Sequence, residues 1–352
     1  MLKAYYKKHT LRFKKPGGTS RGVLTEKNSW YLVVYEDGRP EKKGIGECSI
    51  LPGLSADDHP GFEQKLAEVV RNINHYACRQ DEELKAFPAI RFGLETAMKD
   101  LKADTPRELF PSPFTAGKEG IPINGLIWMG TFEEMYGQIK KKTDQGFDCI
   151  KLKIGAIDFE EELELLGKIR QEFSARDIEL RVDANGAFSP ADAPEKLKRL
   201  SAYDLHSIEQ PIRQGQWEEM ARVCALSPVP VALDEELIGI YQPEKVKEML
   251  EVIQPQYIIL KPGLLGGWKQ SELFISEAGK RNIGWWVTSA LEGNIGLNAI
   301  TQWTFTLNND MYQGLGTGQI FENNIPSPLA IREGSLYYDA DKYWDVSTIL
   351  HD

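Results

Sequence analysis

Eight short β-rich runs follow one another between residues 121 and 318, and helical stretches separate them. Strands that alternate with helices, here at a spacing of roughly 25 to 30 residues, indicate parallel βαβ units. The runs are IPINGLI, CIKLKIG, IELRVDANG, LHSIEQP, VPVALDEE, YIILKPG, IGWWVTSA and MYQGLGTG. Eight units over about 200 residues predict a barrel of the TIM type. The main rival, an open doubly wound sheet, lacks the Gly-rich phosphate loop expected after its first strand.

The chain before these runs has a different pattern. WYLVVYEDG is a β-rich run that ends in a turn signal, and GFEQKLAEVVRNINHYA and AIRFGLETAMKDLKAD have helical spacing of apolar residues. Strands followed by helices predict a small α+β domain at residues 1–115. The barrel is then expected at residues 116–325, and a C-terminal segment, residues 326–352, is expected to pack back on the first domain.

Charge and composition exclude several classes of partner and location. The 352 residues carry a formal net charge of −10 and no long basic run, which excludes nucleic acid and anionic membranes as partners. We find no signal peptide and no run of about 18 apolar residues that could span a bilayer. The four cysteines are scattered without CxxC spacing, so we predict a reduced, cytoplasmic protein.

Charged residues recur at the carboxyl ends of five successive predicted strands. These residues are Lys151 and Lys153 in CIKLKIG, Asp183 in RVDANG, Glu209 in SIEQP, Asp234 in VALDEE and Lys261 in IILKPG. Alternate residues of a strand face the same side, so the two lysines of CIKLKIG point to one place, and in a packed core each charge would be strongly destabilising. The C-terminal end of a barrel is where such proteins hold their catalytic groups.

Each residue also has a local explanation. Asp183 with Asn185 could cap the next helix or form an Asx turn, and Asp234 could open a charged helix. Lys153 or Lys261 could extend to the barrel rim. These explanations do not account for acids on three successive strands with lysines on both sides, so we interpret the set as one site.

Three carboxylates that converge on one point repel one another unless a cation lies among them. Oxygen ligands favour Mg²⁺, and the five histidines are too widely spread to form a zinc site. The charge of a metal and of a neighbouring lysine would lower the pKa of a lysine, which could then act as a base. The sequence therefore predicts removal of the α-proton of a metal-bound carboxylate, with the resulting enediolate held by the metal and a cationic lysine.

These motifs resemble the enolase superfamily, in its muconate-lactonising group. That group has Lys-x-Lys on the second barrel strand, metal-binding acids that end strands three to five, and a lysine that ends strand six. The similarity spans almost the whole chain, and AIRFGLETAMKDL resembles the characteristic helix of the N-terminal domain. The resemblance implies an α/β fold with a modified TIM-type (β/α)7β barrel and an N-terminal α+β capping domain, and a lysine base with Mg²⁺.

Within the group the chain is most similar to the o-succinylbenzoate synthase family. The similarity lies in the loop GECSILPGLS and in RVDANGAF, IEQP, LDEE, LKPGLLGG and SALEGNIGL. It implies a lyase of menaquinone biosynthesis that converts 2-succinyl-6-hydroxy-2,4-cyclohexadiene-1-carboxylate to o-succinylbenzoate. The enzyme would remove the proton alpha to the metal-bound carboxylate and eliminate water on the same face.

The resemblance also implies a role for each site residue. Lys153 would be the base and would then protonate the leaving hydroxide, and Lys261 would stabilise the enediolate from the other face. Lys151 would depress the pKa of Lys153. The implied Mg²⁺ ligands, for which Mn²⁺ can substitute, are Asp183, Glu209 and Asp234. The implied substrate-binding residues are Lys151 and Asn185, Ser289 and Leu291 at the succinyl side chain, and Leu51 and Pro52 over the ring.

Other functions stay open on the same residues. Lysines on both faces of a substrate are also typical of N-succinylamino acid racemase and dipeptide epimerase. Dipeptide epimerases usually carry Asp-x-Asp on the last strand, and MYQGLGTGQIF has no acid after Asp310. A Schiff-base aldolase would use Lys261 as a nucleophile without needing the acids, and a non-catalytic binding protein is expected to have lost a charged residue. The expected partner is a small-molecule carboxylate, and a homo-oligomer is left open.

Overall fold

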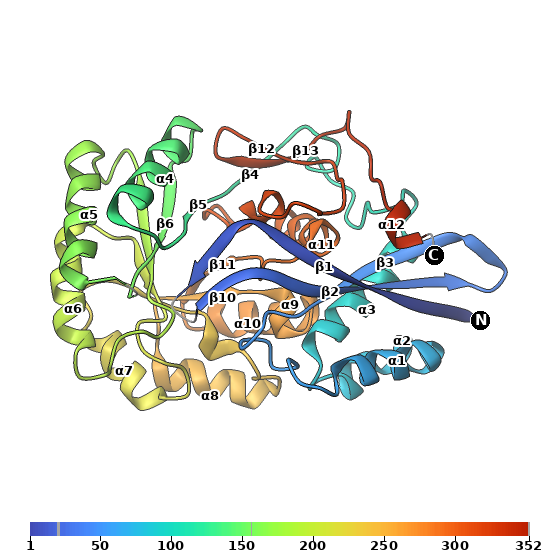
Figure 1. The fold of residues 1–352 in the computed structure, drawn as a ribbon. Coiled ribbons are helices and arrows are strands. Elements are labelled where there is room, and N and C mark those ends of the chain that lie inside the picture. The colour runs from blue at the N-terminus through green and yellow to red at the C-terminus, as the bar shows by residue number, and fades with distance from the viewer. Residues whose placement is uncertain (20–21, 156, 351–352) are drawn as a thin grey trace.

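The computed structural model describes residues 1–19, 22–155 and 157–350 (Figure 1). The N-terminal part is an antiparallel sheet with helices against it, as the α+β pattern predicts. The strands, in the order β1-β2-β3, are β1 (Leu2–Thr19), β2 (Gly22–Glu36) and β3 (Arg39–Ser49). The helices are α1 (Phe62–Arg71), α2 (Ile73–Glu83) and α3 (Pro88–Lys102).

Glycines bring α3 unusually close to β3. A Cβ atom on Gly46 would lie 1.8 Å from the carbonyl oxygen of Gly93, and one on Gly93 would lie 3.1 Å from the backbone nitrogen of Cys48. No side chain fits between these backbones, so the sheet and the helix are in direct contact. Apolar side chains of both elements, among them Leu32 and Leu94, then form one buried core.

The barrel strands form a parallel sheet in the order β11-β10-β9-β8-β7-β6-β5. They are β5 (Gly125–Ile127), β6 (Cys149–Lys153), β7 (Glu179–Asp183), β8 (Ser207–Glu209), β9 (Val231–Leu233), β10 (Tyr257–Leu260) and β11 (Gly284–Val287). The α-helices between and after them are α4 (Phe132–Asp144), α5 (Phe159–Glu172), α6 (Ala193–Leu200), α7 (Trp217–Leu226), α8 (Pro243–Ile253), α9 (Pro262–Leu265), α10 (Trp268–Gly279) and α11 (Asn294–Thr306). The 3₁₀ turns are η1 (Ser201–Tyr203), η2 (Glu235–Leu237) and η3 (Gly316–Gln319).

The eighth β-rich run closes the barrel without forming a regular strand. The amide of Gly314 donates to the carbonyl of Val287 at 2.8 Å, and the amide of Asn124 donates to the carbonyl of Gln313 at 3.0 Å. The buried Gln313 side chain also accepts a hydrogen bond from the amide of Val287, at 2.7 Å. A side-chain amide thus replaces part of the strand ladder. The (β/α)7β prediction is confirmed, and the eighth unit consists of isolated bridges at Gln313 and Gly314.

The chain after the barrel contacts both earlier parts. Strands β12 (Leu329–Arg332) and β13 (Ser335–Tyr338) pair antiparallel, and β13 also pairs with β4 (Ile121–Pro122). Helix α12 (Ser347–Leu350) places Ile349 in a cluster with Tyr31 and Val33 of the N-terminal sheet. The predicted segment 326–352 includes residues 351–352, which lie outside the described residues. The two boundaries between the three predicted segments remain predictions.

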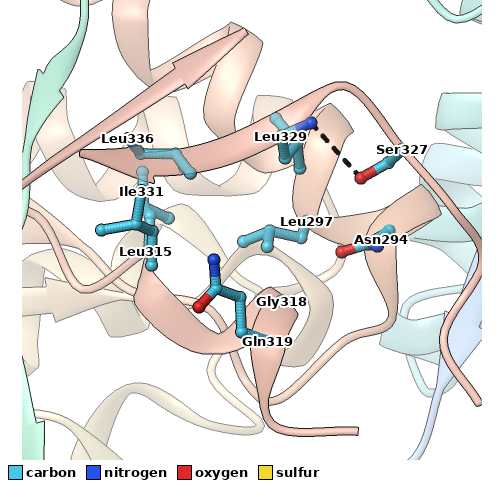
Figure 2. A pocket seen from close by; sticks show the side chains of 9 residues that line it. All are labelled: Asn294, Leu297, Leu315, Gly318, Gln319, Ser327, Leu329, Ile331 and Leu336. Carbon is cyan, nitrogen blue, oxygen red and sulfur yellow. Dashed lines mark hydrogen bonds between the residues drawn. The ribbon is translucent and has the colours of Figure 1, made fainter. Parts of the chain in front are cut away.

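A small cavity lies where the last strands meet α11 and η3 (Figure 2). Its volume is about 100 Å³, and its wall includes Leu297 of α11 and Ile331 of β12. None of the residues predicted to bind metal or substrate lines it. We conclude that the predicted chemistry lies elsewhere. In the described residues we also find no helix with the length and apolar character needed to cross a bilayer.

Candidate active site

Strand register brings the predicted charges to one edge of the sheet. In the parallel pairing of β6 with β7, Lys153 lies opposite Asp183, and in the pairing of β7 with β8, Asp183 lies opposite Glu209. Asp234 follows the end of β9, and Lys261 follows the end of β10. Parallel strands in register end at the same level, so these side chains meet at the C-terminal end of the barrel.

The two lysines of β6 share one carboxylate. The Nζ atoms of Lys151 and Lys153 lie 2.9 Å and 2.8 Å from the same Oδ2 atom of Asp183. Lys151 also forms an ion pair with Glu209. Lys153 donates a second hydrogen bond, 2.7 Å long, to Oδ1 of Asn185. The strand thus directs both ammonium groups at the acids of the next two strands.

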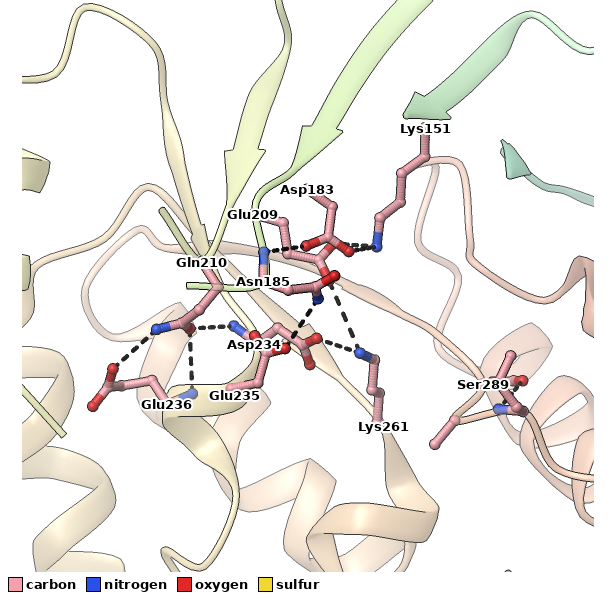
Figure 3. A network of polar contacts seen from close by, with 12 residues as sticks. Lys151, Asp183, Asn185, Glu209, Gln210, Asp234, Glu235, Glu236, Lys261 and Ser289 are labelled. Carbon is pink, nitrogen blue, oxygen red and sulfur yellow. Dashed lines mark hydrogen bonds and ion pairs between the residues drawn. The ribbon is translucent and has the colours of Figure 1, made fainter. Parts of the chain in front are cut away.

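Lys261 approaches the acids from the other side of the cluster (Figure 3). It forms an ion pair with Asp234, and its Nζ atom lies 3.9 Å from Oε1 of Glu209. Lys151 and Lys261 therefore both contact Glu209, whose carboxylate lies at the centre of the set. The lysines come from β6 and from the turn after β10, so cations flank the acids on two sides.

The three acids are buried, and burial and neighbouring charges shift the pKa of groups in the cluster. Asp183, Glu209 and Asp234 are each at most 2% exposed. Burial, together with the charges of Asp183 and Asp234, raises the pKa of Glu209 to about 8. Burial alone would lower the pKa of Lys151, but the three carboxylates outweigh burial and hold that pKa above its ordinary value. The positive charge of the lysines therefore does not fully compensate the carboxylates around Glu209.

The donor set fits a hard divalent cation. Among the described residues, no group of three His, Cys, Asp or Glu side chains is arranged closely enough to hold a metal, and lysine ammonium groups contact the carboxylates instead. Glu209 is paired with Lys151 and lies 3.9 Å from Lys261, and its pKa is nevertheless raised by burial and by the neighbouring acids. A cation such as Mg²⁺ among the three carboxylates would relieve their mutual repulsion.

A shell of polar side chains supports the acids. Asn185, whose φ angle of 44° lies in the left-handed region, donates from Nδ2 to Glu235 at 3.0 Å. Gln210 accepts from the amides of Asp234 and Glu236 at 3.2 Å and 3.3 Å. The Gln210 amide therefore holds the turn that carries Asp234. Gln210 is not among the predicted site residues, although an uncharged polar residue between a strand-end acid and a proline is a usable signal.

The predicted substrate contacts lie in two places. Ser289 and Leu291 belong to the turn after β11, where Oγ of Ser289 is 2.5 Å from Oγ1 of Thr317. Leu51 packs against the apolar cluster that contains Leu291, and Pro52 is exposed and lies outside that cluster. The structure thus brings Leu51 to the cluster of Leu291 and leaves Pro52, the next residue, exposed.

The same apolar cluster contains residues that the sequence analysis did not single out. Its other buried members, Leu11, Phe13 and Phe321, come from β1 and from the segment after η3. Trp128, which follows β5, packs against the cluster. A Cβ atom on Gly17 would lie 3.2 Å from the ring of Trp128, so that glycine allows the β1 backbone to cover the indole. No local sequence pattern marks Trp128, because most of its apolar partners, such as Leu11 and Phe321, are distant in the sequence.

Three comparisons place the chain among known proteins. The family model described as "Enolase C-terminal domain-like" matches residues 134–341. An o-succinylbenzoate synthase from Desulfotalea psychrophila is 47% identical over 365 residues, which cover 94% of this chain and 97% of that protein. An N-succinylamino acid racemase from Thermus thermophilus is 30% identical, over 79% of this chain and 75% of that protein.

The fold comparison agrees with these relatives. The crystal structure of MenC from Desulfotalea psychrophila superposes with a TM-score of 0.85 at 45% sequence identity. The match covers 96% of this chain and 99% of that one. The similarity therefore includes the N-terminal domain as well as the barrel.

Proposed function

The chain belongs to the enolase superfamily, in its muconate-lactonising group, and on this premise we propose that it is an o-succinylbenzoate synthase. It is a carbon–oxygen lyase of menaquinone biosynthesis that dehydrates 2-succinyl-6-hydroxy-2,4-cyclohexadiene-1-carboxylate. The observation that carries this function is the buried acid cluster, with Asp183, Glu209 and Asp234 flanked by lysines on two sides. The similarity to the synthase from Desulfotalea psychrophila over nearly the full length supports the substrate.

The residues that would hold the cation are Asp183, Glu209 and Asp234. A divalent ion held there, with Mg²⁺ as the proposed ion and Mn²⁺ as its substitute, would neutralise the acids and stabilise negative charge that develops on the substrate carboxylate. Magnesium suits these ligands because all of them are carboxylate oxygens.

The base and the acid of the reaction are the same residue in this proposal. The neutral amine of Lys153 takes the proton alpha to the substrate carboxylate, and the electron pair of that C–H bond enters the enediolate. The ammonium of Lys153 then returns the proton to the hydroxyl group, which leaves as water while the ring becomes aromatic. One residue on one face does both steps, so the elimination is syn.

The other lysines stabilise charge. Lys261 lies beyond Asp234 and Glu209, on the other side of the cluster from β6, and its ammonium would face the enediolate from the opposite side of the ring. Lys151, buried between Asp183 and Glu209, would remain charged and orient the substrate carboxylate. Ser289 and Leu291 would contact the succinyl side chain, and Leu51 would cover the ring.

A racemase remains the second candidate for a specific reason. Lysines that approach one centre from two sides can remove a proton on one face and return it on the other, and the racemase from Thermus thermophilus is 30% identical. The four free cysteines, three of them buried, support the further proposal of a reducing, cytoplasmic location.

The deciding experiment compares the two reactions directly. Purified protein with Mg²⁺ is given the cyclohexadiene carboxylate in one assay and N-succinylamino acids in deuterated water in another. A synthase forms o-succinylbenzoate, with kcat/KM at least about a hundredfold above that for racemisation. Deuterium that enters the α-position of the amino acid at a comparable rate would instead assign the chain to the racemases.

A further inference from the structure

A buried ammonium group of the N-terminal domain bonds to the turn after β11. Lys27 lies on β2 and is 2% exposed. Its Nζ atom donates to the carbonyl oxygen of Leu291 at 2.8 Å, and it also donates to Oγ of Ser49. A charged group removed from water remains stable only when it is compensated and hydrogen-bonded. This lysine therefore links the N-terminal domain to the substrate-side turn of the barrel.

Glu47, a second buried charge of the N-terminal domain, caps helix α11, which follows the turn after β11. Glu47 on β3 is fully buried and accepts from the amides of Gly293 and Gly296, at 2.7 Å and 2.9 Å. These amides belong to the N-terminus of the 13-residue helix α11, where backbone donors lack partners within the helix. Ser29 donates a further bond to Glu47 at 2.7 Å. Both glycines leave room, since a Cβ on Gly293 would be 3.1 Å from the carboxylate.

The turn itself carries the counter-charge of Lys27. Glu292 is 1% exposed, and one of its oxygens accepts from the amide of Ala290 at 2.6 Å. Burial lowers the pKa of Lys27, against the opposing charges of Glu292 and then Glu47. Burial likewise raises the pKa of Glu292, against the opposing charge of Lys27. Removing the ammonium would leave two buried carboxylates facing each other across the domain junction.

The turn needs this support because its backbone is strained. Leu291 has a φ of 60°, in the left-handed region that is unfavourable for leucine. Such a conformation persists only where the surroundings over-determine it. Here the carbonyl of Leu291 is held by Lys27 and its amide by Oγ of Ser289, at 3.2 Å. Ser289 and Leu291 are the two residues of this turn that the proposed function places against the succinyl side chain.

We propose that Lys27 is a positioning residue: from the capping domain, and together with Glu47, it holds the turn 289–293 in the shape that binds the substrate side chain. The inference rests on the proposed function, because only that function assigns the succinyl side chain to this turn. Specificity for the side chain then depends on residues that never touch the substrate.

The test uses Lys27→Met, which keeps most of the length of the side chain and removes its charge and donors. With Mg²⁺ present we expect KM for the cyclohexadiene carboxylate to rise at least about tenfold, and kcat to change less than about threefold, since a charge-assisted hydrogen bond is lost away from the reacting atoms. By calorimetry the variant should bind o-succinylbenzoate at least about tenfold more weakly and benzoate about as well as the wild type does. A folded variant with unchanged KM and affinity, or with equal losses for both ligands, overturns the proposal.

Arg107→Met is the matched control. Arg107 is a buried cation paired with Asp100 at 3.3 Å, and its backbone carbonyl bonds to Asn298 and Gln302 of the same helix α11, away from the turn. Its loss should lower thermal stability and leave KM within about twofold. If Lys27→Met does not fold, Ser49→Ala, which removes one partner of the lysine, should still raise KM about two- to fivefold; an unchanged KM there overturns the proposal.

Hydrogen exchange separates a failure of this inference from a failure of the proposed function. If the wild type neither converts the cyclohexadiene nor binds o-succinylbenzoate, the proposed function is wrong. Exchange of the amides of Ala290, Leu291 and Gly293 then decides the inference. We expect exchange at least about tenfold faster in Lys27→Met than in Arg107→Met. Equal protection in the two variants overturns it.

Discussion

Asp183 shows how single side chains keep the site charged. The residue is fully buried, and burial alone would raise its pKa; Lys151 and then Lys153 outweigh burial and hold the pKa well below its usual range. The pKa of Glu209, one strand away, is shifted in the opposite direction, because burial and then the charges of Asp183 and Asp234 raise it. Neighbouring carboxylates thus differ in their need for a further cation, and Glu209 has the greater need.

The lysine roles lead to the first prediction. Lys153→Ala and Lys261→Ala should each lower kcat by about 10²–10⁴-fold, because each removes a group that acts on the reacting atoms. Circular dichroism and thermal unfolding should show a folded protein in both cases. Lys245→Ala is the control, since Lys245 is exposed on α8 and pairs with Glu248 at 2.6 Å. Near-wild-type turnover by either site variant would contradict the role given to that lysine.

The strand-end residues of the site could be predicted from sequence, and their supporting residues could not. Asp183 and Lys261 each follow an apolar run and precede a turn, which is a local pattern. Glu47 lies in a strand whose sequence gives no hint that its carboxylate caps a helix 246 residues later. Contacts of that range depend on how two domains pack. Pro52 is exposed and its neighbour Leu51 is partly buried, and the substrate contact of Pro52 stays a prediction.

At the scale of elements, the ends of β7, β8 and β9 together create the cation site. We expect EDTA to reduce turnover to below about 1%, and Mg²⁺ or Mn²⁺ to restore it, since a bound cation supplies several kcal/mol of stabilisation to the charge that develops in the reaction. Ca²⁺, which prefers more ligands at longer distances, should restore less. Full turnover by protein shown to be metal-free by mass spectrometry would contradict the site.

Two further helix N-termini, one in the N-terminal domain and one in the barrel, are also capped by carboxylates from elsewhere in the chain. Asp57 accepts from the amide of Ala89 in the first turn of α3, at 2.9 Å. Glu95 accepts from the amide of Trp268 at the start of α10, at 2.7 Å. Burial raises the pKa of each carboxyl to about 7, against the opposing effect of these hydrogen bonds. Both caps therefore favour the protonated acid below neutral pH.

The raised pKa of Asp57 gives a prediction with a definite sign. The folded protein binds the proton more tightly than the unfolded chain, so the contribution to stability is complete below pH 4 and is lost as the pH rises toward 7. The full difference is on the order of 4 kcal/mol. Asp57→Asn keeps a hydrogen-bond acceptor without the charge. Its free energy of unfolding, measured in urea and compared with that of the wild type, should therefore rise as the pH is raised from 4 to 7.

Asp177→Asn is the control for that measurement. Asp177 is exposed, and hydrogen bonds from Ser174 lower its pKa, so its stabilising contribution is lost only below about pH 4, and the difference between Asp177→Asn and wild type should stay constant from pH 4 to pH 7. A difference between Asp57→Asn and wild type that stays constant from pH 4 to pH 7 would show that Asp57 is ionised throughout that range.

The strands were predicted accurately where β-rich runs recur at a regular spacing along the chain. The strands β5 to β11 all fall within predicted β-rich runs, because each run is a short apolar segment bounded by turn residues. The eighth run was expected to match the others, and the structure reduces it to bridges at Gln313 and Gly314. The hydrogen bond from the amide of Val287 to the Gln313 side chain leaves no signal in the spacing of apolar residues.

At the scale of the whole molecule, backbone hydrogen bonds and one apolar cluster join the N-terminal domain to the chain that follows η3. The amide of Lys14 on β1 donates to the carbonyl of Ile320 at 2.8 Å, and the amide of Glu322 donates to the carbonyl of Arg12 at 2.8 Å. The rings of Phe13 and Phe321 lie 4.8 Å apart in an edge arrangement beneath this pairing. Since β1 thus pairs with the segment after η3, we expect the N-terminal domain and the barrel to unfold in one transition.

This shared core connects stability to substrate binding, which gives the last prediction. Phe321→Ala removes a buried ring from the cluster that contains Leu291 and packs against Leu51, so it should destabilise the protein by about 3–5 kcal/mol and raise KM about fivefold or more. Phe274→Ala empties an equally buried position on α10. It should cost a similar free energy of unfolding and leave KM within about twofold, because its neighbours belong to the barrel core. Equal effects of the two variants on KM would show that the junction only holds the fold, whereas a change confined to Phe321→Ala would show that it also shapes the pocket.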